Sequence, residues 1–214
     1  MASREEIREQ TRKTRQQLIE AALYLSATEG VASLTLRSVA RKADIAPTSF
    51  YRHFRDIDEL GIELMDDFGM VLGAYQIAVT QELKSLDDST SATTPELVSS
   101  YTEKCIDLFL KHVSSHLQWF HLFFQVQCGA SSKLRKIAGE LSRKLAVSMA
   151  DSLNKPLKAL CIPDNCHLLF TEILVELMMR SGVELLDEHN LADIRSELIN
   201  KVNLLHISRS TPPT

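Results

Sequence analysis

The chain has 214 residues, of which 44% are hydrophobic and 24% are charged, and its formal net charge at pH 7 is −4. This length allows one larger or two small domains, and the composition is ordinary for a soluble globular protein. Glycine (7) and proline (6) are scarce, which favours helices over a turn-rich β fold, and no apolar run reaches the ~18 residues of a membrane span.

The N-terminus and the cysteines bear on where the protein works. The first ten residues have no apolar core, so we expect no secretory signal. Four cysteines are spread along the chain without forming a dense framework, namely Cys105, Cys128, Cys161 and Cys166. We therefore expect reduced thiols and a cytoplasmic location.

The first predicted helix spans residues 5–28. Gly30 follows it, and glycine commonly stands just past the end of a helix. Hydrophobic residues recur at helical spacing in the second half of this segment and predict one apolar face, formed by Leu18, Ile19, Ala22 and Leu25.

Two short helices separated by a tight turn are predicted next. Thr35 is placed to cap a helix over 36–43 by accepting hydrogen bonds from backbone amides one turn on. Residues 44–46 form the turn, and Pro47 opens a helix over 47–54, because a missing N–H costs nothing at the first helical position. A small core against the first helix is expected from Leu36, Val39, Ala40, Ile45, Phe50 and Phe54.

This segment carries positive charge on a chain that is acidic overall. Between Thr35 and Arg55 there are five Lys or Arg residues and one Asp, which gives a net charge of +4. A local basic patch binds DNA phosphates by releasing condensed counterions. With the helix-turn-helix pattern it predicts a surface that lies on DNA, while the same outline also occurs in helical proteins that never contact DNA.

The residues expected at the DNA lie on the third helix and at the start of the second. Short hydroxyl groups in the first turn of the third helix can touch base edges or thymine methyls, and longer side chains beside them can donate to phosphates. The N-terminal amides of the second helix also favour a phosphate. The predicted contact set is Thr35, Arg37, Pro47, Thr48, Ser49, Tyr51, Arg52 and His53.

The remainder of the chain predicts six further helices. Asp56 and Glu59 form a capping arrangement at the start of a helix that runs to about Leu83, and the small polar residues 85–94 predict a loop. The other helices are expected at 95–112, 116–127, 132–154, 164–188 and 191–206, with a break around Pro156 and Pro163 and a disordered tail at 209–214.

Apolar stripes run along the middle helices. Stripes of this kind form plain core in most proteins, so the residues alone leave open whether they enclose a pocket. An apolar cavity lined with Phe and Met would suit a long acyl chain. The candidate lining residues are Phe68, Leu72, Tyr75, Tyr101, Cys105, Leu108, Phe109, Phe120, Phe123, Phe124 and Met149.

Two other clusters carry weaker signals. His112 and His116 have the i, i+4 spacing of some zinc sites, but no carboxylate or cysteine stands at matching spacing nearby, so we expect no metal. Cys161 and Cys166 are interpreted as buried or loop thiols rather than as a redox pair. The sequence contains no nucleophile elbow, no phosphate-cradling Gly-rich loop and no His-Glu-x-x-His, so we expect neither an enzyme nor a cofactor.

Three motifs near the N-terminus form a specific pattern. They are A-A-L-Y-L-S-A-T-E-G at 21–30, S-V-A-R-K-A-D-I-A at 38–46 and F-Y-R-H-F-R-D-I-D-E-L at 50–60. The continuous stretch 12–64 that contains them resembles the DNA-binding domain of the TetR family of bacterial repressors. Within this family, A-P-T-S-F-Y-R-H-F-R-D at 46–56 is most similar to FabR and DesT, the proteobacterial repressors of unsaturated fatty acid synthesis.

The resemblance implies an all-α homodimer with a helix-turn-helix domain at 1–56 and a ligand-binding and dimerisation domain at 57–208. The middle helices would enclose a ligand, and the last two long helices would pair across the dimer. Ligand binding would tilt the helix that starts near Asp56 and change the spacing of the two recognition helices. That spacing must match half-sites of a palindromic operator about 34–36 Å, or a multiple, apart.

The resemblance therefore implies a transcriptional repressor of lipid metabolism genes that responds to a small apolar effector, such as a long-chain acyl thioester. One alternative is a repressor of drug-efflux or other catabolic genes that responds to a different small apolar ligand. Outside this class, the alternative is a helical ligand-binding or interaction protein that never contacts DNA.

Overall fold

The computed structural model describes residues 3–89, 94–159, 162–186 and 190–207, and every regular element in these ranges is a helix. The all-α prediction is therefore confirmed for the described part of the chain. The contacts divide the chain into two compact units, and α4 and α7 contribute to both. The first unit consists of Met1–Gly69 and Gln118–Gly139, and the second consists of Met70–Leu117 and Glu140–Thr214.

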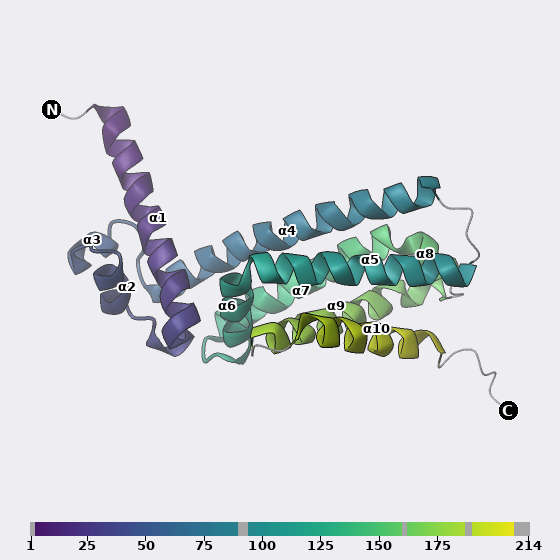
Figure 1. The fold of residues 1–214 in the computed structure, drawn as a ribbon. Coiled ribbons are helices and arrows are strands. Elements are labelled where there is room, and N and C mark those ends of the chain that lie inside the picture. The colour runs from purple at the N-terminus through teal and green to yellow at the C-terminus, as the bar shows by residue number, and fades with distance from the viewer. Residues whose placement is uncertain (1–2, 90–93, 160–161, 187–189, 208–214) are drawn as a thin grey trace. The chain divides into compact units, whose positions relative to one another are not determined.

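The first unit is built around α1, against which α2 packs, while α3 packs against α2 (Figure 1). It includes residues beyond position 56, so the domain boundaries expected from the sequence stay a prediction. Its elements are α1 (Arg4–Glu29), η1 (Val31–Ser33), α2 (Leu36–Lys42), α3 (Pro47–Phe50), the start of α4 (Ile57–Ser89), most of α6 (Leu117–Cys128) and the start of α7 (Ser132–Ser152).

Capping at both ends defines α1. The amide of Glu6 donates to Ser3 Oγ at 3.1 Å, and the amide of Ser3 donates to Glu6 Oε2 at 2.6 Å, which is a capping box. The helix ends at Gly30, whose φ of 86° is a backbone conformation that residues with a side chain rarely adopt. The predicted apolar face is confirmed as buried at Leu18, Ile19, Ala22 and Leu25.

The turn between α2 and α3 uses an aspartate where glycine is usual. Thr35 caps α2 as predicted, because its Oγ1 accepts from the amide of Ser38 at 3.0 Å. At the other end, the amide of Ile45 donates to the carbonyl of Ala40 at 2.9 Å, and Asp44 between them has a φ of 55°. This backward hydrogen bond closes the helix and turns the chain sharply into α3.

Several of the predicted helix boundaries are wrong, and three of the differences have a local cause. The third helix ends at Phe50 rather than at 54, because the amides of the next residues donate to carbonyls three positions back and form tight turns. α4 continues beyond Leu83 to Ser89, since its small polar residues include no Gly or Pro to interrupt it. The predicted break near Pro156 contains the short helix α8 (Asn154–Ala159), in whose first turn the proline breaks no hydrogen bond.

The second unit contains the later parts of α4 and α7 with the helices that follow them. Figure 1 shows α5, α9 and α10 side by side, and α5 packs against α8, α9 and α10. No helix in the described ranges is both long enough and apolar enough to cross a membrane. The remaining elements are α5 (Thr94–Ser115), α8, the short turn η2 (Asp164–Cys166), α9 (His167–Leu186) and α10 (Leu191–Ile207).

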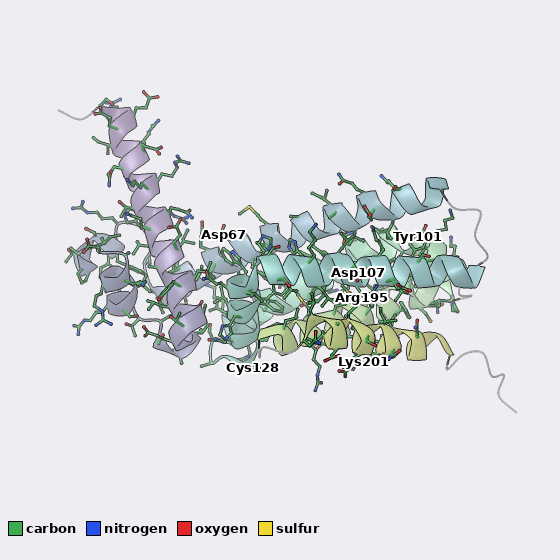
Figure 2. All side chains as sticks on the ribbon, viewed as in Figure 1. Asp67, Tyr101, Asp107, Cys128, Arg195 and Lys201 are labelled. Atoms are coloured by element: carbon green, nitrogen blue, oxygen red, sulfur yellow. The ribbon has the colours of Figure 1, made fainter. Side chains whose placement is uncertain are left out.

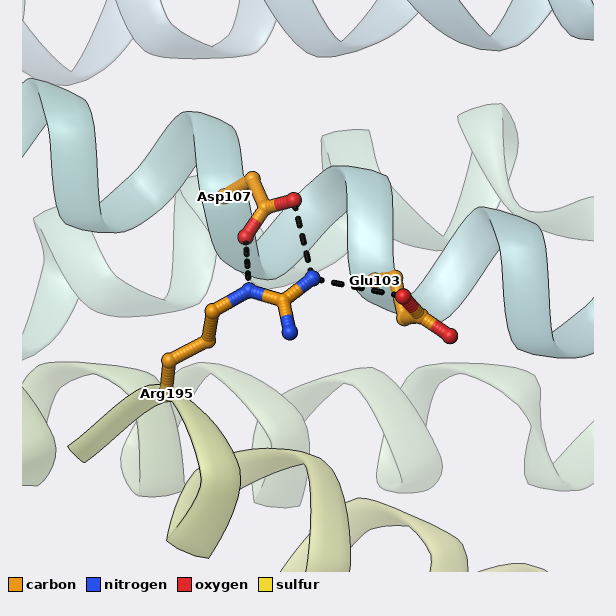
Figure 3. A network of polar contacts seen from close by, with 3 residues as sticks. All are labelled: Glu103, Asp107 and Arg195. Carbon is orange, nitrogen blue, oxygen red and sulfur yellow. Dashed lines mark hydrogen bonds and ion pairs between the residues drawn. The ribbon is translucent and has the colours of Figure 1, made fainter. Parts of the chain in front are cut away.

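An ion-pair network joins α10 to α5 in this unit (Figures 2 and 3). Arg195 donates through Nε to Asp107 Oδ1 at 2.5 Å and through Nη2 to Asp107 Oδ2 at 3.1 Å. Nη2 also donates to Glu103 Oε2 at 3.2 Å. The hydrogen bonds to Asp107, with a smaller contribution from Glu103, raise the pKa of the Arg195 guanidinium. Two parallel hydrogen bonds from one guanidinium to one carboxylate fix the relative orientation of the two groups as well as their separation. The pair of Arg195 and Asp107 therefore helps to orient α10 on α5.

Candidate functional site

The predicted DNA-contact residues of the third helix lie on α3 and on the turn that follows it. Phe50 and Phe54 are buried, with ring centroids 5.7 Å apart, and they anchor both ends of this segment in the core. Between them Tyr51 leaves 63% of its surface exposed, and Arg52 is exposed as well. Thr48, in the first turn of α3, is also exposed. The anchoring rings therefore leave a polar surface free for a partner.

The other predicted DNA-contact residues differ in their solvent exposure. Arg37 near the start of α2 is exposed, and so is Pro47 at the start of α3. Ser49 and His53 are partly buried. Thr35 is exposed, but its hydroxyl already accepts the capping hydrogen bond of α2, so it serves the helix first. We name the surface formed by Arg37, Thr48, Tyr51 and Arg52 the recognition surface.

Arg15 of α1 holds the base of this surface. Its guanidinium lies 4.8 Å from the ring centroid of Phe54 and hydrogen-bonds to Glu63 on α4. A cation over an aromatic face and a carboxylate beside it are both favourable, so one side chain of α1 contacts both the turn after α3 and the start of α4. Burial, followed by the charges of Arg15 and Arg52, lowers the pKa of His53. His53 is therefore a neutral ring at pH 7 and can donate one N–H without adding charge.

Gln125 on α6 is a residue that the sequence interpretation missed. Its Nε2 donates to the carbonyl of Ser26 at 3.0 Å, and its Oε1 accepts from the amide of Val31. The same Nε2 lies 2.7 Å from Nε2 of His121, one turn earlier on α6. These contacts hold the chain on both sides of the bend that ends α1. Gln125 is one of three glutamines in a strongly apolar helix, and nothing local in the sequence marks it for such a role.

The predicted ligand-binding residues of the first unit pack together. Phe68 of α4 lies edge-on to Phe120, with ring centroids 5.2 Å apart, and its ring centroid is 4.8 Å from that of Phe123. All three rings are fully buried, and Phe124 is partly buried. They form the aromatic core between α4 and α6, as tightly packed rings do in any interior. Their role toward a ligand stays a prediction.

In the second unit the predicted residues form a core around Tyr75. The hydroxyl of Tyr75 donates to the carbonyl of Cys105 at 3.3 Å, and its ring centroid lies 5.8 Å from that of Phe109. Burial raises the pKa of the Cys105 thiol to about 12 and raises that of Tyr75 as well, so both are neutral groups at pH 7. Leu72 and Met149 are buried, while Leu108 is partly buried.

Tyr101 and Cys105 line an apolar pocket, which we name the inner pocket. Its walls come from α5, α8, α9 and α10 and include Leu157, Phe170 and Leu174. The cavity volume is about 30 Å³. That is roughly the space of one water molecule in the liquid, so a longer chain can enter this pocket where the walls move apart.

α9 offers an apolar face to solvent. Leu169 is 57% exposed and Ile173 is 41% exposed, whereas Leu174 and Met178 on the opposite side are buried. Positions 169 and 173 are one turn apart, so their side chains are neighbours on the helix surface. Further apolar residues on α9 and α10, the two helices expected to pair across a dimer, have side chains outside the described part of the structure, namely Val183, Leu186, Leu204 and Leu205.

The histidines and cysteines take ordinary structural places. Nε2 of His112 lies 2.8 Å from the carbonyl of Val71, and Nδ1 of His116 lies 2.9 Å from the carbonyl of His112. No three His, Cys, Asp or Glu residues within the described ranges come together to hold a metal ion. Cys105, Cys128 and Cys166 are free thiols, and Cys161 lies outside the described residues, as does the predicted tail.

Comparison with known proteins adds a family match. Residues 18–64 match the model of a family described as bacterial regulatory proteins, tetR family. This stretch contains the second half of α1, all of α2 and α3, and the start of α4. It therefore includes the whole recognition surface.

Solved structures of similar fold cover most of the chain. FadR, a fatty acid degradation regulator from Bacillus halodurans, has a TM-score of 0.65 at 12% identity, over 88% of this chain and 94% of that one. A transcriptional regulator from Aquifex aeolicus has a TM-score of 0.64 at 18% identity, over 90% and 99%. FadR of Thermus thermophilus in complex with lauroyl-CoA has a TM-score of 0.56 at 16% identity, over 94% and 96%. At these identities the likeness shows the fold, and it confirms the predicted architecture.

Proposed function

We propose that this chain belongs to the TetR family of transcriptional regulators and is a cytoplasmic repressor that binds a palindromic DNA operator as a homodimer. The observation that carries the proposal is the recognition surface. Exposed Tyr51 and Arg52 stand between two buried phenylalanines and exposed Thr48 precedes them, all within the segment whose net charge is +4. Hydroxyl and guanidinium groups at the start of a recognition helix suit base edges and phosphates.

The contacts would divide into two kinds. Thr48 at the first turn of α3 suits base readout, because its side chain is short and the helix can approach the major groove closely. Arg37, Tyr51 and Arg52 suit phosphates, and these contacts carry affinity and register without reading sequence. The set predicted from the sequence also includes the exposed Thr35 and Pro47 and the partly buried Ser49 and His53, which would support the same docking.

Homodimer formation follows from the symmetry of an operator and is supported by α9. The exposed Leu169 and Ile173 form an apolar face at the surface of one chain. A two-fold contact that paired this face with its copy would remove it from water and would set the spacing of two recognition surfaces. That spacing must match DNA half-sites about one turn, ~34–36 Å, or a multiple apart.

We propose further that the regulated genes belong to lipid metabolism and that the effector is a small apolar ligand, such as a long-chain acyl thioester. Two structures of the same fold are fatty acid regulators, and one of them is a complex with lauroyl-CoA. The segment 46–56 is also similar to FabR and DesT. The inner pocket is apolar and small, so an acyl chain would have to open it, and a ligand shifts such an equilibrium by its difference in affinity for the two shapes.

The test is a mobility shift with DNA from upstream of the protein's own gene and of nearby lipid-synthesis genes, with and without saturated and unsaturated acyl thioesters. A specific shift that changes with acyl ligand is expected. A specific shift indifferent to acyl ligands would keep the repressor and favour control of drug-efflux or other catabolic genes. The absence of any shift at low salt would contradict the proposal.

A pair of matched variants tests the contact surface itself. Arg52→Gln removes a charge from the recognition surface, and Arg143→Gln removes one from α7, where Arg143 pairs with Glu172 at 2.8 Å. We expect Arg52→Gln to weaken binding to all DNA sequences alike and to lower the salt dependence by about one phosphate contact. Arg143→Gln should bind as the wild type does. Equal binding by all three proteins would remove Arg52 from the interface.

A further inference from the structure

We propose that a cleft beside the inner pocket binds the phosphate-bearing head of an amphiphilic effector through Lys84, Lys155 and Lys158. This inference rests on the proposed function, since it names where the head of such an effector would lie. We name the site the lysine cleft. It is formed by the end of α4, the start of α5, the end of α7 and α8, all within the second unit.

The lysine cleft has the size of a ligand site. Its volume is about 620 Å³, whereas the inner pocket measures about 30 Å³. Small-molecule sites usually lie between roughly 300 and 1,000 Å³. The cleft can therefore hold a bulky polar head, while the inner pocket has room for the beginning of an apolar chain.

Three cations approach the cleft from two helices. Lys155 and Lys158 are three residues apart on α8, so they lie on one face of it, and Lys84 lines the cleft from α4. Asp151 is the one acidic residue among its lining residues, which leaves an excess of two positive charges on a chain whose net charge is −4. Lysine is a compact cation with three donors, and convergent lysines suit phosphate groups.

Hydroxyl groups form the wall between these lysines. Thr80 Oγ1 lies 3.0 Å from Ser152 Oγ, and both residues line the cleft. Behind them Gln76 Nε2 donates to Ser152 Oγ at 2.9 Å. The hydroxyl groups of Thr80 and Ser152 therefore give the cleft a polar wall.

Tyr101, on α5 (Figure 2), lines both the lysine cleft and the inner pocket, so the two cavities are neighbours. The inner pocket lies against α5, α8, α9 and α10, and its lining is apolar apart from Thr102 and the hydroxyl of Tyr101. A ligand with a charged head and an apolar chain would thus meet lysines first and apolar side chains beyond Tyr101. This order of chemistry selects an acyl amphiphile over a free fatty acid or a free nucleotide.

Phosphate could come from two sources, the nucleotide part of an acyl thioester or the head of a phospholipid. The experiment therefore compares four ligands by calorimetry with the full-length protein, at 50 mM and 300 mM salt. The ligands are lauroyl-coenzyme A, coenzyme A, lysophosphatidic acid below its micelle concentration, and lauric acid. The test variant is Lys84→Gln/Lys155→Gln/Lys158→Gln. The matched control removes three exposed lysines outside the cleft, Lys111→Gln/Lys133→Gln/Lys144→Gln.

We expect the test variant to bind lauroyl-coenzyme A at least about tenfold more weakly than the control, since each lost charged hydrogen bond has an energy of that order. The loss of affinity in the test variant should be smaller at 300 mM salt than at 50 mM salt. Both variants should bind lauric acid equally well. Lysine-dependent binding of lysophosphatidic acid in preference to the thioester would assign the head to a phospholipid.

Equal binding of lauroyl-coenzyme A by the two variants would overturn the lysine cleft while leaving the proposed repressor intact. Absence of binding by every phosphate ligand would also overturn it. Lysine-dependent binding that leaves the mobility shift on DNA unchanged would uphold the cleft and contradict the acyl effector. The two proposals therefore fail on different observations.

Discussion

Gln125 of α6 donates a hydrogen bond from Nε2 to the carbonyl oxygen of Ser26, near the end of α1, at 3.0 Å. Its Oε1 accepts from the amide of Val31, on the far side of Gly30. One side chain thus hydrogen-bonds to a carbonyl and an amide on the two sides of the bend between α1 and η1. α6 and the last turn of α1 are therefore joined by specific polar contacts as well as by packing.

We expect Gln125→Leu to lower the free energy of unfolding by about 1–3 kcal/mol, because it leaves backbone groups in a partly buried place without partners. Urea denaturation at fixed protein concentration measures this. Gln118→Leu, at an exposed position on the same helix, is the control and should stay within about 0.5 kcal/mol of the wild type. Equal stability of the two variants would show that water replaces the contacts of Gln125.

The sequence predicted most of the helices because their signals are local. The apolar face of α1, the cap at Thr35 and the proline that opens α3 each depend on residues within a few positions of one another. The contact between Gln125 and Ser26 joins residues 99 positions apart, and no local pattern encodes it. The sequence does not predict α8 because a proline usually breaks a helix, but Pro156 stands in the first turn of α8, where it is tolerated.

The two candidate sites also differ in whether their residues are close together in the sequence. The recognition surface lies within residues 37–52, so charge and spacing in the sequence point to it directly, and its contact with DNA stays a prediction. The inner pocket draws its lining from α5, α8, α9 and α10, and of the predicted ligand residues Tyr101 and Cys105 line it. Apolar periodicity predicts that a side chain is buried, but it does not distinguish tight core from the wall of a cavity.

Asp67 on α4 gives a prediction about pH (Figure 2). Burial and the nearby Glu63 raise the pKa of its carboxyl above the ordinary value of 3.8, against the opposing effect of Arg15. Because the folded-state pKa is raised, the ionised carboxylate costs stability at neutral pH, and this cost disappears as the pH falls through the folded-state pKa. We expect Asp67→Asn to stabilise the protein at pH 7 by roughly 0.2–1 kcal/mol, a small gain because the group is largely solvated.

Urea denaturation of both proteins between pH 7 and pH 4 checks this prediction. The advantage of Asp67→Asn should be constant near neutrality and should shrink toward the acid end, since the wild-type carboxyl then becomes protonated in the folded state. An advantage that stayed constant down to pH 4 would mean that packing of the amide, rather than removal of a charge, stabilises the variant.

Asp44 gives a prediction about the turn before α3. Its φ of 55° lies in the left-handed region, where a β-branched side chain clashes with its own backbone. Asp44→Val should lower stability by about 1–2 kcal/mol, whereas Asp44→Gly should keep the turn. Because Asp44 is exposed, neither change alters core packing. Thermal unfolding compares the variants, and a valine variant as stable as the glycine variant would show that the turn adopts another conformation.

Arg195 gives the last prediction, which concerns the link between α10 and α5. Arg195→Met keeps an apolar stem but removes the hydrogen bonds to Asp107 and Glu103, and it leaves these carboxylates on neighbouring turns of α5 without that cation. Since the three side chains are between 38% and 47% exposed, solvent screens the network, and we expect a loss of about 1 kcal/mol at low salt. The loss should shrink in 1 M salt, where charges are screened within about 3 Å.

Lys201→Met, which breaks the pair with Glu197 inside α10, is the matched control and should cost about 0.2–0.5 kcal/mol. A loss for Arg195→Met that did not respond to salt would assign its effect to packing of the stem and would contradict an electrostatic link between the two helices.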